Sequence, residues 1–366
     1  MSKAIKPIAI YLPQFHPIAE NDQWWGKGFT EWTNSSKAQP LFKDHYQPHL
    51  PADLGFYDLR LEEARLAQEA LAKSYGIHGF CYYHYWFTGK QVLEEPLQRK
   101  MKNPKEDLPF MMCWANENWT KTWIEAERDV LLRQEYSAED DEKHIAFLIP
   151  YFKDTRYIKV NGKPVFMVYR PNLFPDIHKT IQIWRKRVQE AGFPDLYIGF
   201  ARKSVNEVFM DCFDFAFEFQ PSFSDTPAAP KATIWERVKI KTKKISGTYT
   251  PPKVIKNDYE AYANHQMNNK FNPKVYPGIT PMWDNTARKK NYPFILHQST
   301  PEKYKQWLRH IADNFPWEKA SDSFLFINAW NEWAEGNHLE PCQKWGTAYL
   351  EATQEVIEGP SKTSLK

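Results

Sequence analysis

The sequence lacks the features that mark several classes of protein. Its 366 residues include four cysteines and no Cys-x-x-Cys pair, which argues against a zinc or redox site built on cysteine. No apolar run approaches the roughly 18 residues that a membrane-spanning helix needs. The 48 Lys and Arg nearly balance the 45 Asp and Glu, whereas nucleic-acid-binding proteins usually carry a strongly basic stripe. No nucleic-acid partner is therefore expected.

Motifs of several well-defined chemistries are absent as well. The chain contains no Gly-x-Gly-x-x-Gly or Walker loop, no Gly-x-Ser-x-Gly elbow and no His-Glu-x-x-His helix. His16, His45, His49 and His84 could in principle cluster, but their spacing lacks a metal signature. We therefore expect neither a metal ion nor a cofactor.

The N-terminal residues lack the core of a signal peptide. The apolar stretch from Ile8 to Leu12 is only a few residues long and is followed by Pro13. Cys81 and Cys113 lie inside apolar runs, where a thiol usually acts as a small buried hydrophobe. These features predict a cytoplasmic protein, and they do not indicate its oligomeric state.

What the sequence does contain is an alternation of two patterns. Eight short, nearly continuous apolar runs are typical of strands buried on both faces: 8–12, 77–83, 109–114, 164–169, 196–200, 213–219, 275–283 and 324–330. Helical patterns follow most of them: 58–76, 138–152, 176–192, a segment that starts at 300, and 346–358. Eight alternating units predict an α/β fold, a (β/α)8 TIM-type barrel. A doubly wound open sheet is the alternative.

Capping residues mark where these helices are expected to begin. Asp58, Ser137 and Asp176 can each accept a hydrogen bond from a backbone N–H in the first helical turn. Thr300 stands before a proline, which is favoured at the first helical position. We therefore expect the helices to start at these four residues.

The chain is longer than a minimal barrel, which needs about 250 residues. The surplus falls mainly in 13–58 and 221–255, after predicted strand ends, so the loops from strand to helix should be long. No Gly/Ser linker, repeat or low-complexity tract divides the sequence. We predict one catalytic domain over 1–366.

Aromatic residues make up 16% of the chain and include 15 Trp. In a β/α barrel the segments after the strands form the active-site face. Eleven Trp lie there or at a strand's last residue: Trp24, Trp25, Trp32, Trp86, Trp114, Trp119, Trp123, Trp235, Trp283, Trp330 and Trp333. Flat apolar rings suit the C–H faces of sugar rings, so this bias indicates a carbohydrate substrate.

Polar side chains gather on the same face. Carboxylates that follow a barrel strand are more often catalytic than structural, which favours Glu332 and Glu335 as the catalytic pair. Glu31 is expected to orient other groups or to fix a loop. The predicted substrate-binding residues are Trp25, Tyr83, His84, Trp86, Trp114, Asn116, Glu117, Trp119, Glu218, Trp283, Asp284, Asn331, Trp333 and Glu340.

The spacing of the two glutamates suits glycoside chemistry. One carboxyl must handle the proton of the leaving oxygen, and a second must supply a base or a nucleophile. If the chain turns helically after the last strand, Cβ atoms at i and i+3 lie about 5–6 Å apart. Mutual repulsion and exclusion of water should then raise one pKa and leave the other carboxylate ionised.

Long aromatic motifs carry a resemblance to a known family. The chain closely resembles WbsX-type proteins, which are glycosyltransferases or glycoside hydrolase family 99-like proteins of bacterial surface-polysaccharide clusters. The resemblance covers nearly the whole chain. It rests on Tyr11-Leu-Pro-Gln-Phe-His16, Trp24-Trp-Gly-Lys-Gly-Phe-Thr-Glu-Trp-Thr33, Gly79-Phe-Cys-Tyr-Tyr-His-Tyr-Trp86, Trp114-Ala-Asn-Glu-Asn-Trp119 and Asn331-Glu-Trp-Ala-Glu-Gly336.

A weaker similarity to family 99 endo-α-mannosidases centres on Asn-Glu-Trp-x-Glu-Gly. Those enzymes are retaining barrels that pass through a 1,2-anhydro sugar. The resemblance implies that Glu332 deprotonates the sugar 2-hydroxyl and that Glu335 acts as acid and then as base. It also implies an α-linked, manno-configured glycan. The stretches around Trp25 and Trp86 have no counterpart that we can place in the mannosidases.

Three functions fit the sequence. The first is a glycan-cleaving or transglycosylating enzyme that uses the two glutamates. The second is a glycosyltransferase for a nucleotide-activated sugar in lipopolysaccharide biosynthesis, although no Asp-x-Asp motif or phosphate loop is present. The third is a carbohydrate-binding protein without chemistry. A basic stretch, 236–244, is either a solvated loop or a contact with an anionic membrane or a lipid-linked glycan.

Overall fold

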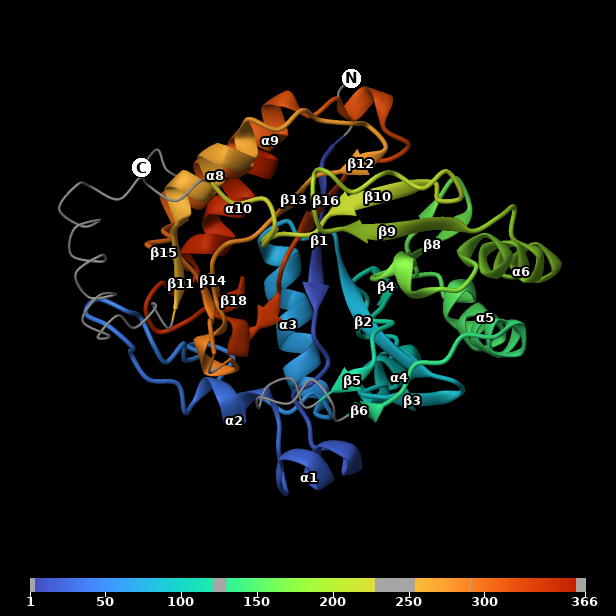
Figure 1. The fold of residues 1–366 in the computed structure, drawn as a ribbon, viewed down its shortest axis with the longest axis horizontal. Helices are drawn as coiled ribbons and strands as arrows, with labels where there is room; N and C mark the ends of the chain where they lie inside the picture. The colour runs from blue at the N-terminus through green and yellow to red at the C-terminus, as the bar shows by residue number, and fades with distance from the viewer. Residues whose placement is uncertain (1–3, 121–129, 228–253, 290, 360–366) are drawn as a thin grey trace, which may run out of the picture.

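The computed structural model describes residues 4–120, 130–227, 254–289 and 291–359. Its centre is a ring of parallel strands (Figure 1). In order around the ring they are β1 (Lys6–Tyr11), β2 (Gly79–Phe87), β4 (Phe110–Trp114), β8 (Lys163–Val168), β9 (Tyr197–Arg202), β10 (Phe215–Glu218), β12 (Val275–Tyr276), β13 (Gly278–Ile279) and β16 (Phe324–Ile327).

The ring closes through a strand that is broken in two. β12 pairs with β10 and β13 pairs with β16, and only Pro277 separates these two short pieces. Proline has no N–H to donate to a sheet, so the seventh strand is interrupted there. Because β16 also pairs with β1, the sheet curls back until its two end strands, β12 and β13, are neighbours in the chain, unlike the separate edges of a doubly wound open sheet. The predicted TIM-type barrel is confirmed, with a strand in each of the eight expected segments.

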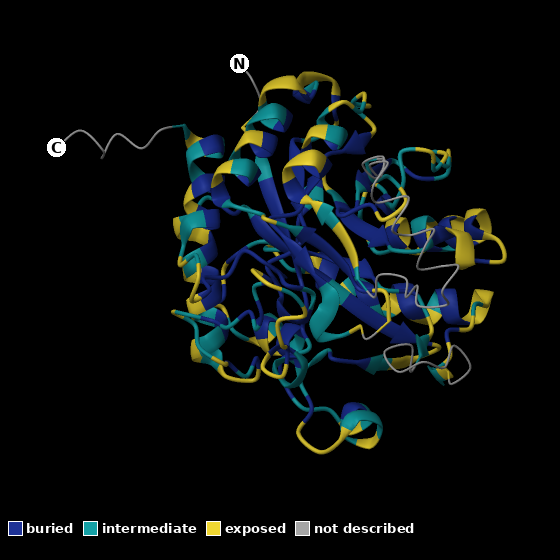
Figure 2. Cartoon of the chain, turned by 60° about the vertical axis from the view of Figure 1, so that its left-hand side comes forward, coloured by how far each residue is buried: buried dark blue, intermediate teal, exposed yellow. Residues whose placement is uncertain are grey.

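In the described ranges, seven helices surround the strands, with exposed outer faces and buried inner faces (Figure 2). They are α3 (Glu62–Ser74), α4 (Glu95–Lys102), α5 (Ala138–Lys153), α6 (Ile177–Glu190), α8 (Tyr259–Met267), α9 (Pro301–Asn314) and α10 (Ala348–Glu358). Residues 203–214, between β9 and β10, form no helix, so one of the eight units is incomplete.

The predicted helix starts are correct at three of four positions. The side chains of Ser137, Asp176 and Thr300 accept hydrogen bonds from the backbone N–H three residues later. Asp58 was expected to cap the first helix, but that helix begins only at Glu62, after Leu61. The Asp58 carboxylate binds the Arg60 side chain and backbone instead, an alternative partner that forms a local turn.

Long loops with their own short elements extend the barrel (Figure 1). The prediction that 275–283 is a single strand is wrong at its end, because the barrel strand stops at Ile279 and Trp283 pairs with a separate sheet. The additional elements are α1 (Ala19–Trp25), α2 (Glu31–Ser35), β3 (Lys90–Val92), β5 (Trp119–Thr120), β6 (Val130–Leu132), β7 (Lys159–Val160), η1 (Pro171–Leu173), β11 (Ile255–Asp258), β14 (Trp283–Asp284), η2 (Asn285–Ala287), β15 (Phe294–His297), η3 (Trp317–Lys319), β17 (Asn331–Glu332), η4 (Trp333–Glu335) and β18 (Asn337–His338).

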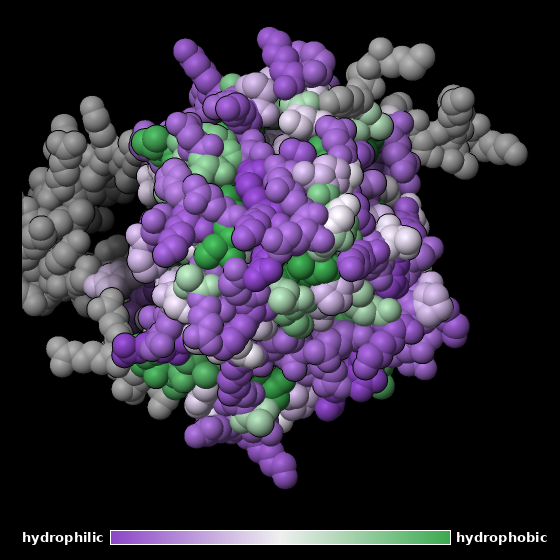
Figure 3. Space-filling model, turned by 90° about the vertical axis from the view of Figure 1, so that its right-hand side faces the viewer, coloured by the Kyte–Doolittle hydropathy of each residue, from purple (hydrophilic) through white to green (hydrophobic). Residues whose placement is uncertain are grey.

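The barrel strands are buried on both faces, as their apolar runs predicted. In β4 every residue from Phe110 to Trp114 is at most 1% exposed, because one set of side chains fills the barrel and the other packs under the helices. The outer face near α5 and α6 is mostly hydrophilic, with scattered apolar residues (Figure 3). In the part of the chain that the structure describes, no helix is both long and apolar enough to cross a membrane.

Candidate active site

Glu332 and Glu335 lie at the two ends of a single tight turn beyond β16. The short strand β17 ends at Glu332, and the 3₁₀ helix η4 ends at Glu335. The turn is thus 3₁₀ rather than α-helical, a geometry that aligns side chains three residues apart. Gly336 follows at φ 53°, and a Cβ there would stand 2.9 Å from the Asp284 Cβ. Both its backbone angle and this close approach require glycine.

Arg288 joins the two glutamates to a third carboxylate. Its guanidinium lies 2.7 Å from Glu335 Oε1, 3.5 Å from Glu332 Oε2 and 2.8 Å from Glu31 Oε1. The Glu31 side chain is only 3% exposed, so it orients the arginine, the role expected for it from the sequence. Glu332 Oε2 is buried and accepts no hydrogen bond from the described residues. Its 3.5 Å contact with Arg288 is an ion pair rather than a hydrogen bond.

Burial raises the pKa of both glutamates. For Glu332 the charge of Glu335 adds to the effect of burial, and Arg288 opposes it only partly, so the pKa lies well above its usual range. For Glu335 burial also raises the pKa, but Arg288 is closer and holds the ionised form more firmly. Glu332 therefore keeps its proton to the higher pH of the two in the free protein.

Three tyrosines face the pair from β2 and from the end of β8. Burial raises the pKa of Tyr83, Tyr85 and Tyr169, and the charge of Glu332 raises each further. The rings of Tyr83 and Tyr169 lie 6.2 Å apart, and those of Tyr83 and Tyr85 lie 6.4 Å apart. These neutral hydroxyls can donate hydrogen bonds to a sugar bound beside the carboxylates.

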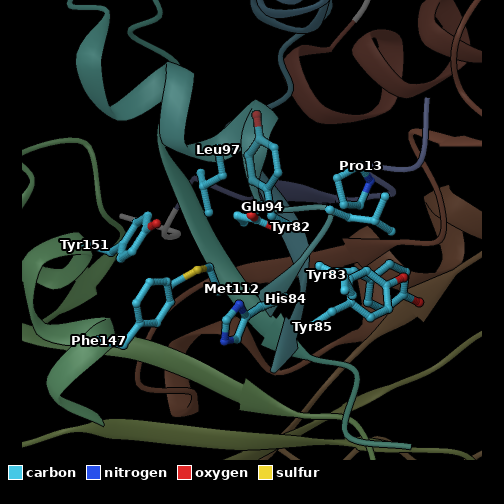
Figure 4. A pocket seen from close by; sticks show the side chains of 12 residues that line it. Pro13, Tyr82, Tyr83, His84, Tyr85, Glu94, Leu97, Met112, Phe147 and Tyr151 are labelled. Carbon is cyan, nitrogen blue, oxygen red and sulfur yellow. The ribbon is translucent and has the colours of Figure 1, made fainter. Parts of the chain in front are cut away.

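His84 points to the opposite side of β2. Figure 4 shows Tyr83 and Tyr85 together on one side, while His84 extends towards Phe147. The small cavity that these residues line has a volume of about 10 Å³, enough for about one water and too small for a sugar. This cavity is therefore not a sugar site.

Three predicted substrate-binding residues are part of the core behind the barrel wall. Trp86 and Trp114 are 4% and 1% exposed, and both rings pack against His144 of α5. His84 Nε2 lies 2.9 Å from His144 Nε2, and burial lowers the pKa of His84 to about 3. The rings of His84, Trp86 and Trp114 are enclosed by protein, and their contact with the sugar stays a prediction.

Three other predicted residues brace the loop that carries the glutamates. The Asn331 amide bonds the backbone N–H and carbonyl of Leu12, tying this loop to the end of β1. Glu340 accepts hydrogen bonds from Trp333 Nε1 at 2.7 Å and from Gln68 at 2.6 Å, and burial raises its pKa to about 7. Asn331, Trp333 and Glu340 are at most 2% exposed and support this loop, and their contacts with the sugar stay predictions.

Asn116 and Asp284 are also committed to protein contacts. The Asn116 amide bonds the backbone N–H and carbonyl of Arg170 at 2.7 and 2.8 Å. The Asp284 carboxylate accepts from His45 at 2.6 Å and from Thr286 at 2.6 Å. These two residues fix loops through these bonds, and their role in binding sugar stays a prediction.

The remaining predicted residues divide by distance from the pair. Trp119 packs on Tyr85 with ring centroids 5.3 Å apart, and it is partly exposed. Glu117 lies beside Tyr169 and raises its pKa. The other three have no recorded contact with Glu332 or Glu335 in the described ranges. They are Trp25 on the projecting α1, the largely buried Trp283, and Glu218, whose pKa burial raises to about 7.

Sequence reasoning missed Arg288, Tyr85, Tyr169 and Lys203. Tyr169 and Lys203 directly follow β8 and β9, so the rule that selected Glu332 would also have selected them. Arg288 follows the 3₁₀ helix η2 in a long loop, and nothing local marks it.

The histidines named as possible metal ligands have different partners. His45 binds Asp284, His49 contacts His338 and His84 contacts His144. Within the described ranges, no three His, Cys, Asp or Glu side chains are placed so that they could hold a metal ion. A metal-independent reaction remains a prediction.

Comparison with known families decides where this fold and site belong. A model of the family described as Glycosyltransferase WbsX matches residues 7–353. The chain belongs to the WbsX family. Its uncharacterized relative WxcX from Xanthomonas campestris pv. campestris is 39% identical over 358 residues, which are 96% of this chain and 49% of the relative. This WbsX-family chain thus spans about half the length of the curated relatives it matches.

Two solved structures share the fold of the WbsX-family chain. A glycoside hydrolase-like protein matches with a TM-score of 0.59 and 14% identity over 97% of this chain and 94% of the other. The GH99 endo-alpha-mannosidase from Bacteroides thetaiotaomicron matches with a TM-score of 0.51 and 14% identity over 96% of both chains. At this identity the likeness shows a common fold. The WbsX-family protein is thus a carbohydrate-active family member with a barrel like those of glycoside hydrolases.

Proposed function

We propose that this WbsX-family protein is an enzyme that cleaves or transfers α-linked, manno-configured glycan in bacterial surface-polysaccharide metabolism. The carrying observation is the position of Glu332 and Glu335 at the barrel mouth, both in contact with Arg288. Two buried carboxyls with raised pKa values and one counter-charge form a proton-handling pair. A product assay on α-manno-oligosaccharides, with retention of configuration scored by NMR, tests this proposal.

The roles of the two glutamates follow from which atoms are available. Glu332 Oε2 lacks a hydrogen-bond donor among the described residues, so the sugar 2-hydroxyl can bind there and pass it a proton. Glu335 is the more exposed side chain, 18% against 7%, so it can reach the leaving oxygen and then a water. Because Glu332 holds the proton in the free protein, substrate binding must shift it towards Glu335.

The manno configuration of the substrate follows from the roles proposed for Glu332 and Glu335. If Glu332 removes the 2-hydroxyl proton, the 2-oxygen attacks the anomeric carbon and the C1–O bond to the leaving group breaks. Glu335 gives its proton to the leaving oxygen. The attack needs the 2-oxygen trans to that group, as in an α-mannoside. Water then opens the 1,2-anhydro ring at the anomeric carbon, and the configuration is retained.

A second candidate is a glycosyltransferase that uses a nucleotide-activated sugar. It is favoured by the name of the family that matches residues 7–353. The hydrolase and the transferase differ in the substrates that the assay must contain. Incubation of the acceptor glycan with and without a panel of nucleotide sugars distinguishes the two functions. Product formed only when nucleotide sugar is present would favour the transferase.

Removing Arg288 should shift the pH dependence to higher values. Arg288→Met deletes the cation that favours the ionised forms of Glu332 and Glu335, so the pKa of each rises. The acid limb of a bell-shaped kcat/KM profile reports the base and the alkaline limb reports the acid, so both limbs should move upward. The control is Arg99→Met, whose guanidinium pairs on the exposed face of α4. An unmoved profile or a shift to lower pH would contradict the arrangement.

Activity should not depend on a divalent ion. The acid, the base and the counter-charge in this mechanism are all side chains, so prolonged dialysis against EDTA should leave kcat/KM unchanged. The measurement is the rate before dialysis, after dialysis and after adding back Mg²⁺, Mn²⁺ or Ca²⁺. Inactivation that one ion reverses would overturn the prediction and shift weight to the transferase.

Four other sequence predictions stay predictions. The basic stretch 236–244 lies outside the described residues, so its proposed contact with a membrane or a lipid-linked glycan has no structural account. Cytoplasmic location, a single domain over 1–366 and the absence of a nucleic-acid partner are likewise untested.

A further inference from the structure

A pair of cations stands on the wall of the barrel mouth opposite the glutamates. Arg170 follows β8, and Lys203 follows β9. β8 and β16 lie on opposite sides of the ring. If β12 and β13 are counted as one strand, three strands separate β8 from β16 in either direction. The Tyr169 ring links the two walls, since both Glu117 on its own side and Glu335 on the far side raise its pKa. The cations and the glutamates thus follow strands on opposite sides of the same ring.

The cations outnumber the carboxylates that neutralise them. Glu117 Oε1 lies 2.5 Å from Arg170 Nη1 but 4.0 Å from Lys203 Nζ, so its stronger ion pair is with the arginine. The Lys203 ammonium lies 3.6 Å from the centroid of the Tyr169 ring. A ring face stabilises a cation without neutralising it.

Other charges nearby do not cancel this excess. The Arg202 guanidinium donates to the carbonyls of Val205 and Glu207. The Glu207 carboxylate accepts from the Lys203 backbone N–H at 2.8 Å, and Glu218 interacts with Arg202. Burial lowers the pKa of Lys203 to about 8, with Glu117 and Glu207 opposing the shift and Arg170 adding to it. The ammonium still carries its proton at neutral pH.

The cation pair is held in place and remains open to solvent. Asn116, which is fully buried, bonds both the backbone N–H and the carbonyl of Arg170. The side chains of Lys203 and Arg170 are 31% and 33% exposed. A ligand can therefore reach both side chains on a preformed loop.

We propose that Lys203 and Arg170 form an anion subsite that selects a glycan carrying a carboxylate, namely a uronic acid residue. Among the described residues, Arg170 pairs with Glu117 and the Glu207 carboxylate accepts from the Lys203 backbone, which leaves the Lys203 ammonium for a single carboxylate of the ligand. A diphosphate carries more charge and would need a cradle of backbone N–H groups. This inference rests on the proposed function, because it places the acidic sugar at the Glu332 site.

The test compares matched neutral and acidic sugars by binding alone. Dissociation constants are measured by NMR titration for mannose and mannuronate, glucose and glucuronate, and galactose and galacturonate, with mannose 6-phosphate as the phosphate arm. The full chain carrying Glu335→Gln is used, so the result does not depend on turnover. We expect at least one uronate to bind about tenfold more tightly than its neutral partner, as a charge-assisted hydrogen bond provides.

Variants identify the residue responsible. Lys203→Met should reduce the ratio of the two dissociation constants to about one, whereas Lys203→Arg should keep the preference. Lys256→Met is the matched control, because Lys256 also lies over an aromatic ring, 4.6 Å from the Phe42 centroid, but outside this rim. Melting temperatures verify folding, and Lys203→Gln replaces Lys203→Met if the apolar side chain lowers Tm.

Three outcomes would overturn the subsite. They are no preference for any uronate, a preference that survives Lys203→Met, and a preference for mannose 6-phosphate without one for mannuronate. Failure of the proposed catalysis looks different. Wild-type protein would then turn over no glycan, while the binding preference and its loss in Lys203→Met would remain.

Discussion

Glu332→Gln and Glu335→Gln should each reduce kcat on an α-manno-oligosaccharide by about 10²-fold or more, the usual loss when a general acid or base is removed. Both side chains contact Arg288, and glutamine keeps their shape but cannot exchange the proton. Folding and glycan binding should be largely retained. The measurements are kcat, KM, the dissociation constant of an unreacted glycan, and Tm.

Leaving-group chemistry then separates the two roles. An aryl α-mannoside with a very acidic phenol needs no protonation to depart, so Glu335→Gln should regain much of its rate on that substrate. Glu332→Gln should not, because attack by the 2-oxygen still needs a base. Recovery by Glu332→Gln instead would reverse the assignment of acid and base. The comparison is needed because the pKa of Glu332 is raised in the free protein, as expected of an acid. Near-full activity of either variant would remove that residue from the mechanism.

Removal of the sugar 2-hydroxyl should abolish turnover altogether. In the proposed mechanism the 2-oxygen is the nucleophile, so a 2-deoxy α-glycoside has nothing with which to displace the leaving group. An α-glucoside should also fail, because its 2-oxygen is cis to that group. The assay compares aryl α-mannoside, α-glucoside and 2-deoxy α-glycoside of the same phenol, with NMR of the first product.

The stereochemical outcome adds an independent check. An α-mannoside should release the α-anomer first, before mutarotation. Release of the β-anomer, or equal rates on the 2-deoxy substrate, would exclude the 1,2-anhydro route. The two glutamates would then remain an acid–base pair of another mechanism, such as direct attack by a carboxylate or by water.

The sequence could not separate the inward-facing from the outward-facing residues of a strand. Successive side chains of a strand point to opposite faces, and in a solvent-exposed sheet the polar ones show which face is outside. In β2 both faces are buried and aromatic, so this signal vanishes. Tyr83 and Tyr85 point to the glutamates, whereas His84 and Trp86 pack under α5. For this reason the sequence could not show that Trp86 and Trp114 pack against His144 of α5.

The sequence by itself determined the order of strands and helices, the barrel, the family motifs and the place of Glu332 and Glu335 beyond the last strand. These follow from local hydrophobic pattern and from the rule that strand ends form one face. Only the tertiary structure decided that Arg288 bridges three carboxylates, that Glu340 braces Trp333, and that Lys203 and Arg170 share Glu117. Such contacts depend on where long loops place residues far apart in the chain. Arg288 and Glu31 form their hydrogen bond across 257 residues of sequence, and no local sequence pattern around either residue predicts it.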